Sequence, residues 1–572
     1  MDAIDRRIGL LFIGFAVLLA FAVLRSVDLG VIQAAPLRRA AVSEHITDEP
    51  LPAMRGTITS ANGVVLALSE AADDVIVDPY LTVAAQPATS ARKLASLLGM
   101  PFSTVLATLT KPHAGYAVLA AKVTPATARR VMALGINGVS LNPDVRRVYP
   151  MPWSASQVLG GVYANLQPHG VPAGSGDAGI ELQYNPVLSG SSGERRIVAD
   201  ELGQTVSVDE VRPMRAGRSL TVTLNSALQN YVEQVLTGVG AEWRPKGATA
   251  IVMSPSTGSI LALANWPRVN AYDPGGAPSQ DLMDKAVGYS YEPGSTFKAF
   301  TVSAAIQDGL VTPGTEIYVP SILHVYNRTI QDAELHPSEY MSVAQILKVS
   351  SNIGAVEIGK LLGAARFSAW VRRFGFGERT GIDLPGEQTG IVPQLSQYSG
   401  VSMANLPFGQ GQSVTPIQMA TAYSAIANGG MLRAPHVVSA IGGRSVALPP
   451  AHRIVSQTTA AEIRDMLRGV LADGGTASGA AIPGYDLAGK TGTAQVAING
   501  SYSKTEFVGS FIGMVPAADP KLVVAVMVDE PQGGYYGAQV AAPAFKKIVE
   551  WAVPYFGIHP NPAHVDTSQP AG

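Results

Sequence analysis

The sequence predicts an α+β protein of several domains that is attached to a membrane by a single N-terminal helix. An apolar segment runs from Ile8 to Leu24 without a charged residue. Near the C-terminus, strand-like runs follow one another with turn residues and no helix between them, so they should pair antiparallel. These runs are 493–498, 506–515 and 522–528. Helical patterns gather in the middle of the chain, which favours segregated rather than alternating α and β elements.

The N-terminal apolar segment is predicted to be an uncleaved membrane anchor, residues 8–26, after a short tail, residues 1–7. Its length is at the lower limit for crossing a hydrocarbon layer about 30 Å thick. Arg6 and Arg7 precede it. The positive-inside rule then places the N-terminus in the cytoplasm and the remaining chain outside the bacterial cytoplasmic membrane. The alternative is a cleaved signal peptide, but the apolar run is long for one and a good cleavage site is missing.

Composition excludes several functional classes. The formal net charge is -2, so there is no global field that would attract nucleic acid. The chain has no cysteine, which rules out disulfides, thiolate metal sites and a cysteine nucleophile. The 9 histidines show no ligand spacing. We therefore expect neither a metal nor an organic cofactor.

Two large regions follow the anchor. Residues 27–215 show β-rich patterns with some helix, and we expect a non-catalytic pedestal or dimerisation-like domain. It carries a hairpin signal at Ala61–Gly63 and no convergent titratable cluster. Residues 216–558 are predicted to form the catalytic domain, and residues 559–572 a flexible tail. The elements expected in the two regions are helices 88–98, 125–134, 226–239, 342–362, 415–427 and 542–551, a strand at 219–224, and a hairpin of 248–253 with 259–264.

The first chemical motif is Ser295-Thr296-Phe297-Lys298. Pro293 and Gly294 precede it, and Ser295 can open a helix directly after them. Ser295 and Lys298 would then lie one turn apart on the same face. A serine hydroxyl is a weak nucleophile until a base takes its proton, and a partly desolvated lysine can be that base. The motif alone is weak because such matches arise readily by chance.

The second motif is Ser350-Ser351-Asn352, which interrupts an apolar helical pattern. It is either an ordinary helix break or a part of a catalytic cleft. In the second case the Ser350 hydroxyl relays a proton and the Asn352 amide holds a substrate carbonyl.

The third motif is Lys490-Thr491-Gly492-Thr493 on a predicted strand. Lysine, hydroxyls and a glycine on one strand can bind a peptide and its terminal carboxylate, and Gly492 would let the backbone approach. The segment Gly484–Thr491 also matches a phosphate-binding loop literally. That loop requires a following helix, whereas further strand-like runs follow here.

The order S-x-x-K, S-x-N and K-[ST]-G is far more specific than any of the three alone. In this order the chain resembles the penicillin-binding proteins and serine β-lactamases. Additional segments resemble class B penicillin-binding proteins, the monofunctional peptidoglycan D,D-transpeptidases. They are Arg55-Gly56 with Asn62-Gly63, Gly179-Ile180-Glu181, Ile382–Glu387, Phe408–Gly411 with Val414–Pro416, and Asp473–Ala477. The compact N-terminal region and Asp78-Pro79 favour the division type, similar to penicillin-binding protein 3, over the elongation type, similar to penicillin-binding protein 2.

The resemblance implies a five-stranded antiparallel sheet with helices on both faces and a serine acyltransferase mechanism. Ser295 would attack the penultimate D-Ala of a stem peptide, Lys298 would be the base, and Ser350 and Lys490 would move the proton to the leaving D-Ala. Backbone N–H groups of Ser295 and Thr493 would form the oxyanion hole. Thr491 and Thr493 would bind carboxylate beside Gly492, and Asn352 would position the stem. A side-chain amine of a neighbouring stem would resolve the acyl-enzyme.

The partners that the resemblance implies are the peptidoglycan stem peptides, β-lactams as covalent inhibitors, the cytoplasmic membrane, and a polytopic glycosyltransferase with other division or elongation proteins. Two other functions stay open. One is a β-lactamase-type hydrolase with Glu387 as its base, although the class B pattern also carries that residue. The other is a catalytically silent scaffold or β-lactam sensor, although Ser295, Lys298 and Lys490 are all present.

Overall fold

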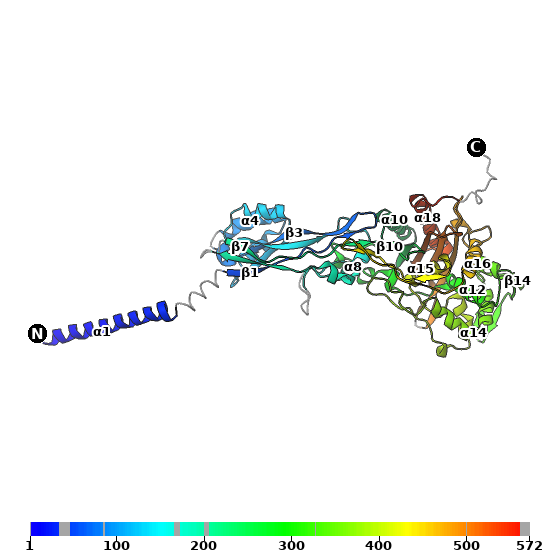
Figure 1. The fold of residues 1–572 in the computed structure, drawn as a ribbon, viewed down its shortest axis with the longest axis horizontal. Helices are drawn as coiled ribbons and strands as arrows, with labels where there is room; N and C mark the ends of the chain where they lie inside the picture. The colour runs from blue at the N-terminus through cyan, green and yellow to red at the C-terminus, as the bar shows by residue number, and fades with distance from the viewer. Residues whose placement is uncertain are drawn as a thin grey trace, which may run out of the picture. The chain divides into compact units, whose positions relative to one another are not determined.

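The computed structural model describes residues 2–33, 46–83, 86–164, 172–199, 205–326, 328–498 and 500–560. They divide into two compact units (Figure 1). The first unit comprises residues 1–55, 69–146 and 189–217, and the second comprises residues 56–68, 147–188 and 218–572. Each unit is therefore built from several stretches of chain.

The predicted anchor forms a helix. Helix α1 (Asp2–Val27) continues into a short π-helical turn, η1 (Asp28–Ile32). The segment Arg7–Ile32 is long and apolar enough, by length and composition, to cross a membrane. Its leucine, isoleucine and phenylalanine side chains are exposed over most of its length. The prediction of an N-terminal helix of this kind is confirmed.

The first unit is rich in β-structure, as the sequence predicts. Its strands are β1 (Ile46–Leu51), β6 (Gly193–Ala199) and β7 (Thr205–Arg212), which form a three-stranded antiparallel sheet, and β3 (Val65–Val77), β4 (Ala117–Val123) and β5 (Val139–Val148). Its short helices are α3 (Pro79–Val83), α4 (Pro87–Leu98), α5 (Phe102–Leu109) and α6 (Pro125–Met132). Thr124 caps α6 by accepting a hydrogen bond from the Thr127 amide, as its sequence position predicts. A small apolar core lies between these elements, with Val75, Leu94 and Val131 at its centre.

The second unit contains a five-stranded antiparallel sheet in the order β10-β9-β21-β20-β19. The strands are β9 (Gly247–Met253), β10 (Ile260–Trp266), β19 (Ala488–Ile498), β20 (Ser501–Val515) and β21 (Leu522–Asp529). The antiparallel pairing of the three C-terminal strands is confirmed. Strand β19 begins before the predicted residue 493, so the whole Lys490–Thr493 segment lies within the strand. In this order of described strands β19 is last, and its outer edge faces no further strand of the sheet.

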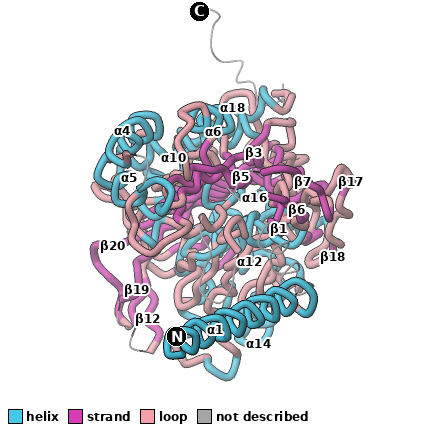
Figure 2. The backbone as a smooth tube through the Cα atoms, turned by 90° about the vertical axis from the view of Figure 1, so that its left-hand side faces the viewer, coloured by secondary structure: helices cyan, strands magenta, loops and turns pink. Residues whose placement is uncertain are grey.

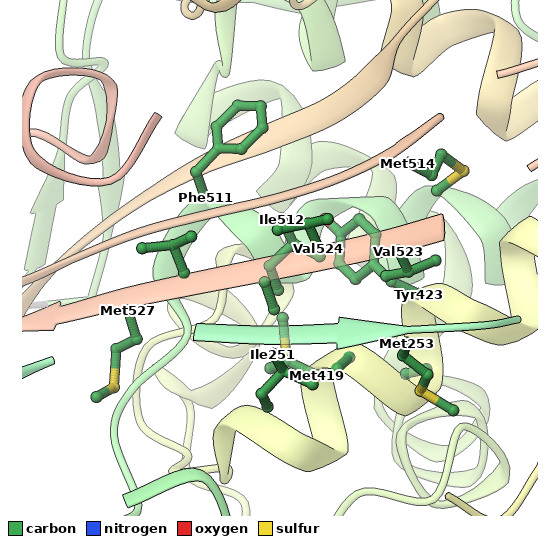
Figure 3. Packing of buried hydrophobic residues seen from close by; sticks show 14 of the residues in the cluster. Ile251, Met253, Met419, Tyr423, Phe511, Ile512, Met514, Val523, Val524 and Met527 are labelled. Carbon is green, nitrogen blue, oxygen red and sulfur yellow. The ribbon is translucent and has the colours of Figure 1, made fainter. Parts of the chain in front are cut away.

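Helices cover both faces of this sheet, which confirms the predicted fold class. The helices that pack on its strands are α10 (Ser226–Trp243), α11 (Lys285–Gly288), α15 (Pro416–Ala427), α16 (Gln457–Arg468), α17 (Gly537–Val540) and α18 (Ala542–Tyr555). The second unit also contains α12 (Lys298–Gln307), α13 (Val343–Val349) and α14 (Asn352–Arg373). On one face, Met419 and Tyr423 of α15 pack against β9 and β21 (Figure 3). On the other face, Phe511 of β20 lies 4.7 Å, between ring centroids, from Phe545 of α18.

Smaller elements connect these layers. The nucleophile segment forms a 3₁₀ turn, η5 (Gly294–Phe297), and two more such turns, η7 (Ser402–Ala404) and η8 (Leu406–Phe408), lie before α15. Two hairpins lie between α12 and α13, formed by β11 (Glu316–Val319) with β14 (Glu339–Ser342) and by β12 (Leu323–Val325) with β13 (Arg328–Ile330). Strand β12 is labelled at the lower left of Figure 2. The remaining elements include β2 (Ile58–Thr59), β8 (Leu220–Val222), β16 (Val438–Ile441), α7 (Ser156–Leu159) and α8 (Gly179–Gln183).

Some expectations about loops and ends fall partly outside the described residues. The predicted Asn-Gly hairpin is confirmed, since β2 and β3 pair antiparallel on either side of it. The predicted C-terminal tail, residues 559–572, is described only to residue 560. The long helix expected over residues 342–362 is two helices, α13 and α14, because the chain turns at Ser350 and Ser351.

Candidate active site

Ser295 lies in the tight turn η5, directly before α12. The Gly294 amide donates to the Gly409 carbonyl at 3.0 Å, and the Tyr423 hydroxyl donates to the Thr296 carbonyl at 2.7 Å. These bonds fix the turn from two sides. Ser295 is half-buried between fully buried neighbours, and among the described residues its hydroxyl has no hydrogen-bond partner within 3.5 Å. The Ser295 hydroxyl therefore lies in a rigid turn and is not used in a structural hydrogen bond.

A glycine is required directly before the nucleophile. Gly294 has φ +54°, and a Cβ at this position would lie 2.8 Å from the Thr493 carbonyl oxygen. A Cβ at Gly492 would lie 2.4 Å from Ser510 Oγ and 2.9 Å from the Pro293 carbonyl. Both glycines therefore let the nucleophile turn pack directly against β19. For Gly492 this packing is a more immediate reason than the substrate approach that the sequence suggested.

Lys298 begins α12, one turn after Ser295, and its side chain is fully buried. Its Nζ donates to the Ser350 carbonyl at 2.5 Å, to Asn352 Oδ1 at 2.7 Å and to Ser350 Oγ at 3.2 Å. The first and second motifs therefore meet at one ammonium group. Burial lowers the pKa of Lys298 to about 7, against the opposing charge of Asp332. A lysine with this pKa is substantially neutral near pH 7 and can accept a proton.

The Ser350–Asn352 break turns the second motif toward Lys298. Ser350 has φ +63°, a left-handed conformation that is unfavourable for a residue other than glycine. Ser351 caps α14 by accepting the Gly354 amide at 2.8 Å. The side chain of Asn352, the first residue of α14, also donates to the Gln331 carbonyl at 3.1 Å. The sequence left open whether this segment is an ordinary helix break, and here the break itself delivers two polar groups to Lys298.

Asp332 anchors the break, a role that the sequence motifs did not predict. One carboxylate oxygen accepts the amides of Asn352 and Ile353, the latter at 3.0 Å. The other accepts the Ser351 hydroxyl at 2.6 Å and lies 2.9 Å from His336 Nε2. A carboxylate before the first turn of a helix is stabilised by the unpaired amides there. The only signal in the sequence is an acid and a histidine four residues apart, on a segment that ends well before the second motif.

His336 completes this support. Burial lowers the pKa of His336, whereas the Pro337 carbonyl and the Asp332 side chain raise it. The net effect on His336 is a raised pKa. Its Nδ1 lies 2.7 Å from the Pro337 carbonyl oxygen, so that nitrogen carries a proton. The imidazole lies between the Pro337 carbonyl and the Asp332 side chain, and both interactions favour its charged form.

The third motif supplies a second buried lysine. Lys490 on β19 is fully buried, and burial together with the charge of Lys298 holds its pKa well below the ordinary value. Its Nζ lies within reach of the Thr491 hydroxyl, at 3.3 Å. Two ammonium groups that oppose each other's charge in a dry site favour a state in which at least one is neutral. The phosphate-loop alternative fails, because this segment is a strand and not a loop that opens a helix.

The threonines of the third motif are already engaged by neighbouring loops. The Thr491 hydroxyl lies 3.0 Å from the Thr476 hydroxyl, and Thr493 Oγ1 accepts the Gly537 amide at 3.0 Å. Thr476 belongs to the Asp473–Ala477 segment that the sequence singled out by resemblance. Each threonine hydroxyl keeps further hydrogen-bonding capacity, since a hydroxyl has one donor and two acceptor positions.

Two glutamates of the second unit differ in role. Glu387 is buried and accepts hydrogen bonds from the Thr380 amide at 2.6 Å and the Gly381 amide at 3.3 Å. Both carboxylate oxygens therefore bind the backbone of the loop that contains Glu387. Glu292, three residues before Ser295, accepts the Gly411 amide at 3.1 Å and the Tyr502 hydroxyl at 3.2 Å. Burial raises the pKa of Glu292 to about 7. No sequence pattern assigned Glu292 a role.

Comparison with known proteins agrees with this geometry. Residues 248–550 match the family model of the penicillin-binding protein transpeptidase domain, and residues 50–222 match that of the penicillin-binding protein dimerisation domain. Stage V sporulation protein D of Bacillus subtilis is 33% identical over 90% of this chain and 80% of its own. A probable peptidoglycan D,D-transpeptidase PenA of Neisseria gonorrhoeae is 30% identical over 97% of this chain and 94% of its own.

Solved structures are similar over most of the chain. Penicillin-binding protein 3 of Mycobacterium tuberculosis, in its apo form, has a TM-score of 0.70 and 28% identity, and covers 90% of this chain and 99% of its own. The same protein in complex with ampicillin has a TM-score of 0.70 and 28% identity, over 91% of this chain and 99% of its own.

Proposed function

Since the chain belongs to the class B penicillin-binding proteins and carries their transpeptidase and dimerisation domains, we propose that it is a serine D,D-transpeptidase that cross-links peptidoglycan stem peptides through an acyl-enzyme on Ser295. One observation carries this proposal most strongly. The buried Lys298, with its pKa lowered to about 7, joins the nucleophile helix to Ser350 and Asn352. A rigid serine and a lysine that can be neutral are the two parts that serine activation requires.

In the proposed acylation step, the Ser295 oxygen attacks the carbonyl carbon of the penultimate D-Ala. Its proton passes to neutral Lys298, and the carbonyl oxygen becomes an oxyanion held by the backbone amides of Ser295 and Thr493. The tetrahedral intermediate collapses as the peptide bond breaks. The departing D-Ala amine receives the proton through Ser350 and Lys490. In the second step, an acceptor amine attacks the ester, forms the new amide and returns the proton to Ser295.

The remaining motif residues would hold the substrate. The open edge of β19 can pair with an extended peptide, because β19 is the last of the described strands in this sheet. Thr491 and Thr493 would donate to the terminal carboxylate, next to the positive potential of the lysine pair. Asn352 would orient the stem, while its oxygen stays on Lys298. These assignments follow from the residues' positions around the turn that holds Ser295.

The engagement of Glu387 favours transpeptidation over β-lactam hydrolysis. A hydrolase of this superfamily needs a base that activates water for rapid deacylation. Glu387 is the candidate that the sequence offered, and Thr380 and Gly381 occupy its two oxygens. A silent scaffold would gain nothing from two buried lysines, whose desolvation is costly without a chemical role.

The cellular setting is also proposed. The N-terminal segment Arg7–Ile32 would anchor the chain in the cytoplasmic membrane, with the N-terminus inside and the catalytic residues outside. We assign residues 27–215 to a pedestal domain, residues 216–558 to the catalytic domain and residues 559–572 to a tail. Septal synthesis is favoured over elongation, in line with the similarity to structures of penicillin-binding protein 3. A polytopic glycosyltransferase of the same complex is the proposed protein partner.

Covalent labelling with a fluorescent penicillin tests the enzymatic proposal. We expect a stable adduct on the wild-type protein and none on Ser295→Ala, because only the hydroxyl can form the ester. Glu387→Gln is the matched control and should label as the wild type does. Rapid release of the label with hydrolysis of penicillin would favour the hydrolase, and a labelled Ser295→Ala protein would contradict the assigned nucleophile. A fluorescent fusion that spreads along the side wall instead of the septum would contradict the division role.

A further inference from the structure

A shallow pocket of about 540 Å³ in the second unit is used by none of the steps above. Its lining consists of Tyr326, which follows β12, and the segment Ser399–Val401, which precedes η7. This lining is neutral: an aromatic ring, a hydroxyl, a glycine backbone and a small aliphatic side chain. The pocket therefore suits an uncharged ligand with both apolar and hydrogen-bonding faces.

The pocket is connected to the active site on both sides. Strand β13, which pairs with β12, leads into Gln331 and Asp332, the two residues that hold the Ser350–Asn352 break. On the other side, η7 and η8 lead to Gly409, whose carbonyl holds the Gly294 amide before the nucleophile. A ligand in this pocket would thus lie one short segment from each half of the catalytic machinery.

The backbone of Tyr326 has an unusual conformation. Its φ is +50°, a left-handed conformation that favours asparagine, aspartate or glycine. For a tyrosine this conformation is unfavourable. Its side chain is 83% exposed, so burial does not compensate. The tight turn of the hairpin requires this conformation, because Val325 pairs with Arg328 on either side of the turn, and the turn leaves the Tyr326 ring exposed.

Gly400, on the other side of the pocket, lies directly against the same ring. A Cβ at Gly400 would lie 2.6 Å from two atoms of the Tyr326 ring. With glycine at this position the backbone meets the ring without displacing it, and the peptide groups of residues 399–401 lie beside the aromatic ring. An aromatic ring beside backbone hydrogen-bonding groups and a serine hydroxyl is a surface on which a flat, polar ring can stack.

We propose that this pocket binds an N-acetylated sugar of the glycan strand that carries the stem peptides. The inference rests on the proposed function, because it takes peptidoglycan as the substrate. A pyranose ring presents C–H groups to an aromatic face and hydroxyl and acetamido groups at its rim, and these match Tyr326, Ser399 and the Gly400 backbone. Stem peptides carry carboxylates, which would call for a basic side chain, and the lining residues include none. Binding here would position a polymeric substrate relative to Ser295.

Direct binding of a peptide-free probe tests this inference. The probe is the tetramer of β-1,4-linked N-acetylglucosamine, titrated into the full-length wild-type protein and followed by saturation-transfer NMR. We expect wild type and Tyr326→Phe to bind alike, and Tyr326→Ala to bind roughly tenfold more weakly, since the stacking ring is lost. Tyr340→Ala removes a tyrosine that is 65% exposed but does not line the pocket, and it should bind as the wild type does.

Penicillin labelling of Ser295 in all four proteins separates this inference from the proposed function. Absence of labelling in the wild type would count against the transpeptidase, and it would leave the sugar titration readable. Any one of three results would overturn the glycan pocket. The first is a wild-type protein that does not bind the tetramer. The second is Tyr326→Ala and Tyr340→Ala binding it equally well. The third is an equal loss for free pentapeptide donors in Tyr326→Ala, which would assign the pocket to the stem.

Discussion

The two units of the molecule differ in how deeply some of their charged side chains are buried. In the second unit, Lys298 and Lys490 are 0% exposed. In the first unit, the side chains of the Arg196–Asp48 pair are 45% and 40% exposed. A buried ammonium loses its hydration, so its pKa falls and it becomes a base near neutral pH. An exposed pair stays hydrated and screened, so it changes little. Burial, more than the presence of charge, creates reactivity here.

The sizes of the two apolar cores account for this difference in burial. The apolar core of the first unit is a small cluster that surrounds a few residues of α4 and β3. The second unit has a large continuous core that includes the sheet, α12 and α15. Phe297 and Phe300 flank the start of α12, with ring centroids 5.5 Å apart. A large core keeps water away from Lys298, which a small core cannot do. The predictions below test this contrast, from the largest expected effect to the smallest.

The rate of acylation should depend steeply on pH. Because the pKa of Lys298 is lowered to about 7, its neutral form gains population as pH rises through 7. The rate of penicillin acylation should therefore rise about tenfold per pH unit below pH 7 and level off above it. Stopped-flow labelling between pH 5 and pH 9 measures this profile. Lys298→Met should acylate at least about a thousandfold more slowly, and an unchanged rate in this variant would remove Lys298 as the base.

Asp332→Asn should lower the acylation rate roughly 10–100-fold and shift its pH midpoint downward. The asparagine loses an acceptor for Ser351 and His336, so the break that carries Ser350 and Asn352 loosens. The charge of Asp332 also raises the pKa of Lys298, so its removal should lower that pKa further. The pH profile of Asp332→Asn checks both effects.

Glu387→Gln is the control for this shift, since Glu387 does not act on Lys298 and its midpoint should stay in place. A slower Asp332→Asn enzyme with an unmoved midpoint would mean that Asp332 only shapes the fold.

Leu94→Ala should destabilise the first unit by about 2–5 kcal/mol, the usual cost of truncating a fully buried leucine. Leu94 is 0% exposed in the small core. Chemical denaturation followed by circular dichroism measures the change, and penicillin labelling of Ser295 should stay at the wild-type rate under native conditions. Leu81→Ala, at a residue 48% exposed, should have almost no effect. A loss of labelling in Leu94→Ala would show that the catalytic residues depend on the small core.

Asp48→Asn should have the smallest effect. The Arg196 guanidinium beside Asp48 lowers the pKa of that carboxyl, but both groups face solvent. Replacing the carboxylate should leave the melting temperature and the labelling rate unchanged within error. A melting temperature several degrees lower would show that surface ion pairs contribute to the first unit more than their exposure implies.

The candidate site was predictable where it depends on local patterns. Ser295 and Lys298 are three residues apart, so any helical turn brings them to one face. The strands β20 and β21 and the cap of α6 by Thr124 also follow from local periodicity and turn residues. Asp332 was not predictable, because its bonds to Ser351 and Asn352 span 19 and 20 residues. No period within a helix or strand links residues so far apart.

The sequence by itself determined the apolar N-terminal helix, the antiparallel C-terminal strands and the three motifs, since each depends on neighbours within a few residues. Only the tertiary structure decided that Lys298 lies against Ser350 and Asn352. It also decided that Gly294 and Gly492 are contact points between η5 and β19, and that the Lys298 and Lys490 side chains are fully buried. The physical reason is desolvation. The pKa of a lysine depends on how much water and which charges surround it, and those surroundings are assembled from distant segments only when the core closes.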